Sequence, residues 1–301
     1  MFEVVDVTDW ETASTIEPIG TRPKQWLLDG SGSSWLFKEA RSDDERPSGQ
    51  DWAEKAVAEL AKLLEVPAAT VELARRSGTR GVISRNFVNK AASLVHGNEL
   101  LSANDPAYPQ DQLRNDTPGY NVAAIRDVLG PYVDHAGGTR RARSAFDGFF
   151  GYLVLDAWVN NTDRHHRNWG IVLEPTGSLA PSFDHGSSLA FGITDTKRAS
   201  LLAAGDDEIR RWLERGQTRS FEGMPAMLDI TVAGWEFIES TERTVWIDRL
   251  TNLRDDDVDE VLDRIPADGL AGVVLSDVSR TLCKEILRIN RLRLLDALTT
   301  H

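Results

Sequence analysis

Short apolar runs and one amphipathic stripe characterise the first 90 residues. Residues 24–28 and 34–38 are apolar runs joined by a glycine-rich turn, which predicts two adjacent strands. Residues 71–73 and 81–88 are predicted to form two more strands. Between these pairs, residues 51–65 repeat apolar residues at helical spacing. The face that this helix would bury contains Trp52, Ala56, Leu60 and Leu63.

The rest of the chain has mainly helical spacing. A strongly apolar helix is predicted over residues 144–159, and two short strands over 169–173 and 179–183 follow it. A loop rich in Pro, Asp and Asn spans residues 102–118. From Asp195 onward, apolar residues recur every three or four positions, as in helices that bury one face. Helices are therefore predicted over 207–214, 224–239, 258–264 and 279–298.

A small β-rich part followed by a mainly helical part is the plan of a bilobal protein kinase. We therefore predict an α+β protein with a protein-kinase-like fold. The β-rich N-lobe is expected over residues 1–90, where it would bind the phosphates of a nucleotide. The mainly helical C-lobe is expected over residues 91–301, where it would carry the catalytic loop and a magnesium site.

The composition narrows the choice of partner and compartment. Hydrophobic residues make up 41% of the chain and charged residues 27%, as in globular rather than disordered proteins. A net charge of −13 repels nucleic-acid phosphates and anionic lipid, so we expect no direct binding to nucleic acid or to membranes. The single cysteine, Cys283, excludes an intramolecular disulfide. No signal peptide or membrane-spanning run is recognisable, which predicts a cytoplasmic protein.

The most informative polar residues follow the apolar helix. Asp163 comes first, Asn168 lies five residues later, and Asp184 lies sixteen residues after Asn168, beyond the predicted strand pair. In phosphoryl transfer, one carboxylate orients the attacking hydroxyl and accepts its proton, while Asn and Asp oxygens hold magnesium. An isolated Asp in such a polar turn is usually an ordinary loop residue, but this combination favours catalysis. Asp163 is therefore the predicted catalytic base, and Asn168 and Asp184 are the predicted magnesium ligands.

Two adjacent histidines, His165 and His166, lie between these residues. Together with His185 they invite a zinc hypothesis. However, adjacent histidines seldom point at one metal ion, and zinc usually takes three or four protein ligands. We therefore expect the pair to brace the loop through hydrogen bonds. His165, two residues after Asp163, is included in the predicted catalytic site.

A phosphate-binding lysine is the other group that ATP chemistry requires. Lys38 ends an apolar strand before the predicted helix, where a glutamate could hold it against the α- and β-phosphates. Most strand-end lysines are simply exposed. Glu54 has capping-box spacing from Asp51, which is a competing explanation for that residue. The sequence favours Glu54 over Glu59 as the partner of Lys38 without excluding Glu59.

Three further segments are candidates for contact with ATP. Gly20 and Lys24 precede and begin the first of these strands and could cover the phosphates, although a lone glycine is a weak signal. Gly30 to Ser33 is richer in glycine, and its simplest role is the hairpin turn, with phosphate contact or autophosphorylation as the alternative. Phe87 and Val88 end a strand where the two lobes would meet, so they are predicted to contact adenine at a hinge. Core packing is the alternative explanation for that pair.

On these residues, the sequence resembles the kinase core of the HipA-like serine/threonine kinase family. The matching stretches, in order over about residues 16–190, are Lys24–Leu28, Leu36–Lys38, Glu54–Pro67, Asn161–His165 with Asn168, and Pro181–Asp184. The resemblance implies that Asp163 is the catalytic base and that Asn168 and Asp184 bind Mg²⁺. It also implies that Lys38, with Lys24 nearby, binds the phosphates of ATP.

The same resemblance implies a class of partner. Members of this family phosphorylate protein hydroxyls, so a protein with a Ser or Thr acceptor is the implied substrate. Several members are toxins that a small DNA-binding antitoxin holds in check, which makes an antitoxin-type protein a candidate partner. Longer members carry an extra N-terminal subdomain, for which the early position of Lys38 leaves no room. This difference counts against an antitoxin partnership.

Two other interpretations stay open. Asn161 to Arg164, with Asn168 and Trp169, is also similar to type II phosphatidylinositol 4-kinases. A lipid or small-molecule kinase is therefore an alternative, although the acidic charge of the chain disfavours a lipid substrate. A nucleotide-binding pseudokinase that acts as an interaction module is another alternative. The intact set of Lys38, Asp163, Asn168 and Asp184 argues against it, because a pseudokinase often lacks one of these groups.

Overall fold

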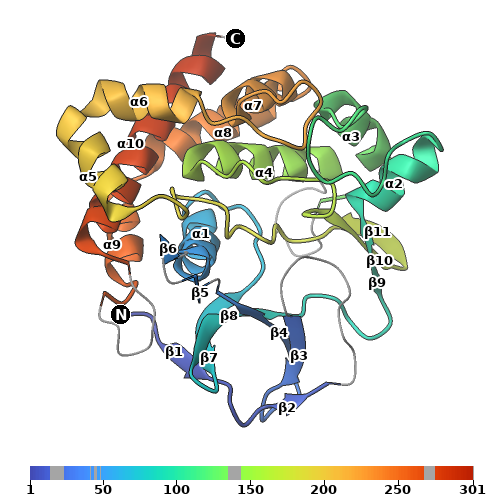
Figure 1. Ribbon diagram of the computed structural model, residues 1–301. Helices are drawn as coiled ribbons and strands as arrows, with labels where there is room; N and C mark the ends of the chain where they lie inside the picture. The colour runs from blue at the N-terminus through green and yellow to red at the C-terminus, as the bar shows by residue number, and fades with distance from the viewer. Residues whose placement is uncertain are drawn as a thin grey trace.

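The protein consists of a curled β-sheet and an assembly of helices, with one helix, α1 (Gln50–Leu63), between them (Figure 1). The computed structural model describes residues 1–13, 24–40, 42–43, 46–47, 49–134, 144–267 and 275–300. The predicted α+β class is confirmed. The predicted order, a β-rich part followed by a mainly helical part, is confirmed as well.

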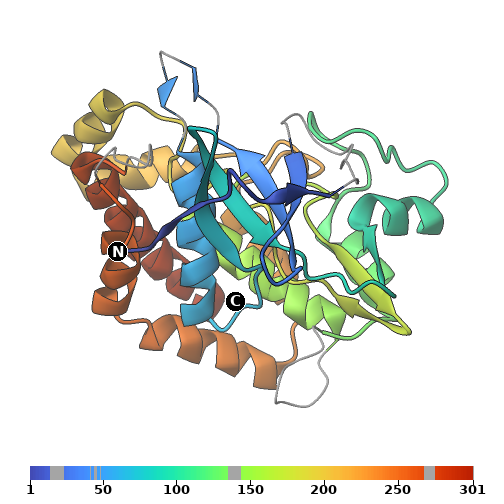
Figure 2. The same ribbon diagram turned by 90° about the horizontal axis from the view of Figure 1, so that it is seen from below.

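The β-rich part is a six-stranded sheet in the order β1-β7-β8-β4-β3-β2. β1 pairs with β7 in parallel, and every other neighbouring pair is antiparallel. Seen from below, the strands of this sheet lie in front of the helical part (Figure 2). A separate two-stranded pair is formed by β5 (Ser42–Asp43) and β6 (Arg46–Pro47). The strands of the large sheet are β1 (Val4–Asp6), β2 (Glu11–Thr12), β3 (Lys24–Leu28), β4 (Ser34–Glu39), β7 (Val71–Arg76) and β8 (Thr79–Arg85).

The predicted hairpin between the first two long strands is confirmed, and its register matters for the site. β3 and β4 pair so that Lys24 lies opposite Lys38. The carboxylate of Asp29 organises the turn by accepting hydrogen bonds from the backbone N–H groups of Ser31 and Ser33, both at 2.9 Å. The polar turn therefore fixes the strand register by local hydrogen bonding.

Helix α1 begins at Gln50, and Gly49 occupies its N-cap position. The predicted capping box between Asp51 and Glu54 is therefore wrong. The physical reason is that both carboxylates are buried and engaged elsewhere. Asp51 forms an ion pair with Arg80 of β8 at 3.2 Å, and Glu54 turns toward β4. The helix is thus tied to the sheet by charged side chains as well as by its apolar face.

Helix α4 (Ala145–Val159) forms the centre of the helical part, as its apolar sequence predicts. Ser144 caps it in a reciprocal pair with Asp147. Gly151 lets another helix approach closely, because a Cβ atom there would meet the Trp246 ring at 2.7 Å. Asn160 ends the helix in a left-handed conformation with φ 55°. The chain then passes directly to Asp163.

The remaining elements surround α4 (Figure 1). A three-stranded sheet in the order β11-β10-β9 consists of β9 (Ser93–His96), β10 (Gly170–Glu174) and β11 (Thr176–Leu179). The predicted strand over 179–183 is wrong beyond Leu179, because the hairpin is tighter than predicted. The other helices are α2 (Gly97–Asn104), α3 (Val122–Leu129), α5 (Asp195–Ala204), α6 (Asp206–Glu214), α7 (Met227–Trp235), α8 (Ser240–Asn252), α9 (Asp255–Asp263) and α10 (Asp277–Thr300).

Within the described part of the chain, no helix combines the length and the apolar character that crossing a bilayer requires.

Candidate active site

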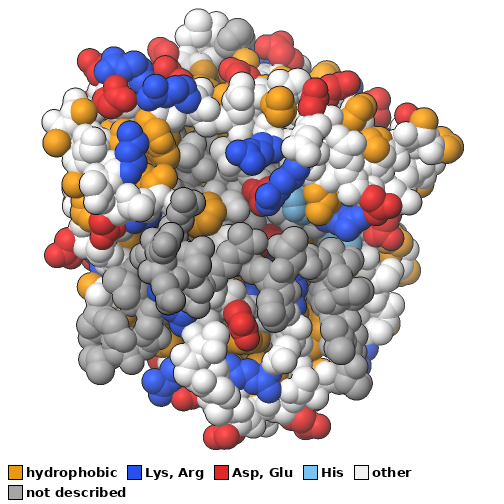
Figure 3. Space-filling model, in the orientation of Figure 1, with side chains coloured by type: hydrophobic (Ala, Val, Ile, Leu, Met, Phe, Trp, Pro, Cys, Tyr) orange, Lys and Arg blue, Asp and Glu red, His pale blue; other side chains and the backbone are white. Residues whose placement is uncertain are grey.

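A cavity of about 460 Å³ lies between the large sheet and the segments on either side of the β10–β11 hairpin. On the face drawn in Figure 3, basic side chains lie next to acidic and histidine side chains near the junction of the sheet and the helices. The cavity brings together residues that are up to 171 positions apart in the sequence, from Ala13 to Asp184. Its lining includes Lys24, Leu36, Lys38, Phe87, Val88, Leu94, His165, Arg167, Asn168, Phe183 and Asp184.

Lys38 is the buried cation of this cavity. Its Nζ donates to Glu54 Oε1 at 2.8 Å and to Asp184 Oδ1 at 3.3 Å. Burial acts to lower the pKa of Lys38, but the charges of Asp184 and Glu54 outweigh it, so the pKa is raised. The lysine is therefore held as a fixed positive charge.

The alternative partner of Lys38, Glu59, belongs to a different ion pair. Its Oε1 accepts from Lys55 Nζ at 2.7 Å, and Lys55 also contacts Glu72 Oε2 at 2.8 Å. Glu54 and Glu59 are five residues apart, so they point from different faces of α1. The structure thus resolves the choice that the sequence left open, in favour of Glu54.

The loop after α4 holds Asp163 through its backbone. The Asp163 N–H donates to Asn161 Oδ1 at 3.2 Å, and its carbonyl accepts from Asn168 Nδ2 at 2.8 Å. Its carboxylate accepts from Arg114 and from Ser187. The side chain is 23% exposed, so an acceptor hydroxyl can approach it. The predicted base therefore sits in a loop whose geometry is fixed.

Arg164 organises this loop, a role that the sequence pattern did not predict. It is fully buried and forms two bonds with Asp156 of α4, Nε to Oδ2 at 2.6 Å and Nη2 to Oδ1 at 2.8 Å. It also donates to the Asn168 carbonyl at 2.7 Å and to Ser182 Oγ at 3.0 Å. Arg164 thus joins the segments that carry Asp163, Asn168 and Asp184. An Asp within the apolar sequence of α4 was the available signal, because a buried carboxylate requires a partner.

Asn168 and Asp184 both face the cavity, and their donor atoms suit a hard cation. The Nδ2 of Asn168 is engaged by the Asp163 carbonyl, which leaves the amide oxygen as the group for a metal. The side chain of Asp184 is 33% exposed, and its backbone has φ 62°. One amide oxygen and one carboxylate, completed by phosphate oxygens and water, fit the coordination that Mg²⁺ prefers. Among the described residues, no group of three or more His, Cys, Asp and Glu side chains could hold a metal ion.

Burial lowers the pKa of three histidines near the site. Burial lowers the pKa of His166 to about 3, and its Nδ1 lies 2.6 Å from the hydroxyl of Tyr108. Burial also places the pKa of His185 well below its usual value, and His185 Nε2 lies 2.7 Å from Ser182 Oγ. His165 lines the cavity, and its pKa is lowered mainly by burial. The expected bracing of the loop by hydrogen bonds holds for both His165 and His166, since His165 Nδ1 accepts from the Arg167 N–H at 3.2 Å. A catalytic role of His165 stays a prediction.

Because of these lowered pKa values, His166 and His185 are expected to reduce stability in mild acid. In the unfolded chain they bind protons below about pH 6.5, whereas in the folded protein they do not, so the unfolded state is favoured as the pH falls. We expect the free energy of unfolding to fall between pH 7 and pH 5 by up to about 1.4 kcal/mol per pH unit for each such histidine. Urea titrations at these pH values measure it. His166→Gln should reduce this slope, and an unchanged slope would contradict the assignment.

Lys24, Phe87 and Val88 all lie at the cavity. The prediction that Phe87 and Val88 end a strand is wrong, because β8 ends at Arg85 and the pair lies in the segment that follows it. Phe87 stacks against Phe183 with ring centroids 5.8 Å apart, so both aromatic side chains form one apolar wall. The N–H of Val88 donates to Asn86 Oδ1 at 2.9 Å. Gly20 lies outside the described residues. None of the residues from Gly30 to Ser33 lines the cavity.

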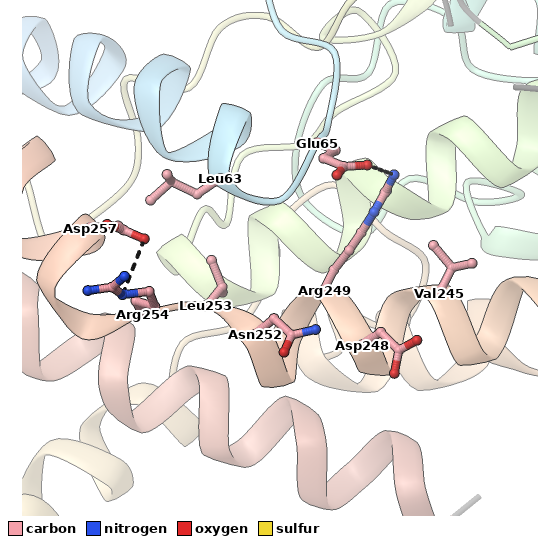
Figure 4. A pocket seen from close by; sticks show the side chains of 9 residues that line it. All are labelled: Leu63, Glu65, Val245, Asp248, Arg249, Asn252, Leu253, Arg254 and Asp257. Carbon is pink, nitrogen blue, oxygen red and sulfur yellow. Dashed lines mark hydrogen bonds and ion pairs between the residues drawn. The ribbon is translucent and has the colours of Figure 1, made fainter. Parts of the chain in front are cut away.

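A second cleft, of about 320 Å³, lies at the C-terminal end of α1 and shares no lining residue with the first (Figure 4). It is formed by the end of α1, by α8 and by the start of α9. Arg249 crosses it to Glu65 at 2.6 Å, and Arg254 lies near Asp257. It contains none of the predicted site residues, so the chemistry is assigned to the first cavity.

Comparisons with known proteins support the fold. The family model described as the HipA-like C-terminal domain matches residues 16–249. A comparison with curated protein sequences gives no match. The chain is similar to the solved structure of the Helicobacter pylori proinflammatory kinase CtkA, with a TM-score of 0.75 and 15% identity over 99% of this chain and 97% of that one. At this identity the likeness shows the fold alone, and the predicted kinase-like fold is confirmed.

Two other solved structures are less similar to this chain. One is HipA of Shewanella oneidensis MR-1, solved with HipB and operator DNA, with a TM-score of 0.43 and 12% identity over 95% of this chain and 68% of that one. The other is a Golgi casein kinase, with a TM-score of 0.44 and 14% identity over 100% of this chain and 72% of that one.

Proposed function

The chain belongs to the HipA-like C-terminal domain family, and on that basis we propose that it is a kinase that transfers the γ-phosphate of ATP to a Ser or Thr hydroxyl of a protein. The observation that carries this proposal is the contact of the buried Lys38 with the buried Glu54 and with the part-exposed Asp184, in one cavity with Asn168. Burying a lysine with a carboxylate is costly for a fold, so such groups are concentrated at functional sites.

Each group has a distinct task in the proposed reaction. Lys38, held by Glu54, would bind the α- and β-phosphates of ATP, with Lys24 beside it on the neighbouring strand. Phe87 and Phe183 would cover the adenine with their apolar wall. Asp163 would accept the proton of the attacking hydroxyl as the bond to the γ-phosphorus forms.

Asn168 and Asp184 would hold Mg²⁺, which neutralises phosphate charge when it is bound. Asn168 has a second function that does not depend on the metal. By donating to the Asp163 carbonyl, its amide fixes the backbone that carries the base. One side chain therefore links the position of the base to the position of the phosphates.

The remaining parts of the proposal rest on the family resemblance. The acceptor would be a protein, and an antitoxin-type protein is a candidate partner. We propose that the two lobes meet near residue 90 and that the protein acts in the cytoplasm. Identifying phosphorylated peptides after incubation with a proteome and labelled ATP would test the class of acceptor, and label confined to lipid or small molecules would contradict a protein acceptor.

Lys38→Met tests the phosphate-binding step. Removing the cation leaves Glu54 and Asp184 facing each other without their shared partner. We expect the affinity for ATP to fall and turnover to fall on the order of a hundredfold, the effect of removing one preorganised charged donor. Lys62→Met is the matched control, because Lys62 is an exposed lysine paired with Glu59 on the same part of the fold. Undiminished transfer by Lys38→Met would contradict the proposed function.

A further inference from the structure

Arg114 contacts the proposed catalytic base. Its Nη2 lies 3.2 Å from Asp163 Oδ2 and 3.4 Å from Oδ1. Ser187 also contacts this carboxylate, with its Oγ 3.4 Å from Oδ2. The Arg114 side chain is 57% exposed. Its guanidinium group is thus within reach of a ligand and directly beside the base.

The fold holds the turn that carries Arg114 from one side. The carbonyl of Leu113 accepts from Ser220 Oγ at 2.9 Å, and Asp116 Oδ1 accepts from the Gly223 N–H at 2.6 Å. The two residues after Arg114, Asn115 and Asp116, have φ values of 70° and 60°. Asn and Asp adopt this left-handed conformation more readily than other residues with a Cβ atom, and the contacts around the turn hold them in it.

The same segment is also tied to the catalytic loop. Arg167 Nη2 donates to Asp111 Oδ1 at 2.6 Å, and the Tyr108 hydroxyl lies 2.6 Å from His166 Nδ1. Arg114 therefore lies between two anchored ends. The fold therefore sets the backbone position from which the Arg114 side chain reaches Asp163.

An exposed ion pair adds little to stability, so the contact with Asp163 does not by itself account for an arginine at this position. A guanidinium group is, however, well suited to bind phosphate oxygens through two parallel hydrogen bonds. In the proposed reaction the γ-phosphate must lie next to the hydroxyl that Asp163 deprotonates. That position is within reach of Arg114.

We propose that Arg114 is a ligand of the γ-phosphate of ATP and that Asp163 holds it in place until the nucleotide binds. This inference rests on the proposed function. When ATP binds, the guanidinium group moves from the carboxylate to the γ-phosphate oxygens, which frees Asp163 to accept a hydrogen bond from the hydroxyl. In the transfer step, the acceptor oxygen bonds to the γ-phosphorus and the bond to the β–γ bridging oxygen breaks. The proton passes to Asp163 and ADP leaves.

A contact between Arg114 and the γ-phosphate affects nucleotide binding even without turnover. ADP lacks the γ-phosphate, so Arg114 should favour ATP over ADP. We expect Arg114→Ala to bind the imido analogue of ATP on the order of tenfold more weakly with Mg²⁺ present, which is the loss of about one charge-assisted hydrogen bond. Its affinity for ADP should be unchanged. Titration calorimetry with both nucleotides measures the ratio.

Kinetics provide the second readout. We expect Arg114→Ala to lower kcat on the order of a hundredfold, and Arg114→Lys to recover part of this loss, because a lysine retains the charge but not the paired donors. Arg75→Ala is the matched control. It removes an arginine from the exposed ion pair with Asp6 on the outer part of the sheet and should change neither readout.

The outcomes separate this inference from the proposed function. An unchanged ratio of analogue to ADP affinity in Arg114→Ala overturns the role of Arg114, even if the wild type transfers phosphate. If the wild type binds both nucleotides but transfers nothing, the proposed transfer fails, and a reduced ratio in Arg114→Ala still supports the γ-phosphate contact. A wild type that binds neither nucleotide overturns both.

Discussion

Asp163→Asn is expected to reduce phosphate transfer by on the order of a thousandfold, which corresponds to about 4 kcal/mol of transition-state stabilisation. An amide has nearly the shape of the carboxylate but cannot accept the hydroxyl proton. The backbone contacts of residue 163 with Asn161 and Asn168 do not involve the changed atoms. The loop should therefore keep its form, and ATP affinity should be largely retained.

The measurement is transfer of the labelled γ-phosphate with Mg²⁺, with Asp163→Ala run in parallel. Asp6→Asn is the matched control, because Asp6 forms an exposed pair with Arg75 as Asp163 does with Arg114. Label on the wild type and on Asp6→Asn, without label on the Asp163 variants, would support the assigned base. Retained activity in Asp163→Ala would exclude the mechanism, because no carboxylate then remains at that position.

Arg164→Met is expected to lower the free energy of unfolding by about 3–5 kcal/mol, the usual cost of removing one partner from a buried ion pair. The carboxylate of Asp156 would be left fully buried without its cation. The carbonyl of Asn168 and the hydroxyl of Ser182 would also lose a donor. Since whole domains are stable by only about 5–15 kcal/mol, urea titrations of the variant should show a much lower midpoint.

A double variant separates charge from hydrogen bonding at this position. Asp156→Leu combined with Arg164→Met removes both charges, so much of the lost stability should return. The loop contacts of Arg164 would still be missing, so transfer activity should remain low although the protein is folded. Equal stability of the single and double variants would show that the uncompensated carboxylate is not the cause of the loss. Full activity of the double variant would show that Arg164 does not position the loop.

Local patterns were enough to predict several elements and the order of the site residues. The apolar runs on either side of a polar turn predicted β3 and β4, because pairing across a short turn depends on neighbouring residues. The apolar sequence before residue 160 predicted α4 as a central helix. The spacing of Asp163, Asn168 and Asp184 indicated phosphoryl transfer. By contrast, the bounds of the strand after β10 and the cap of α1 were predicted wrongly, since tertiary contacts decided them.

By itself, then, the sequence determined the α+β class and the chemical types of residue at the candidate site, because these follow from short-range periodicity and from the reactivity of side chains. Tertiary structure alone decided which groups meet. Glu54 rather than Glu59 contacts Lys38, because the packing of α1 turns one of its faces toward β4. Arg114 reaches Asp163 from 49 positions away, because two long-range anchors fix its turn. Such contacts depend on how distant segments pack, and no local spacing in one sequence encodes them.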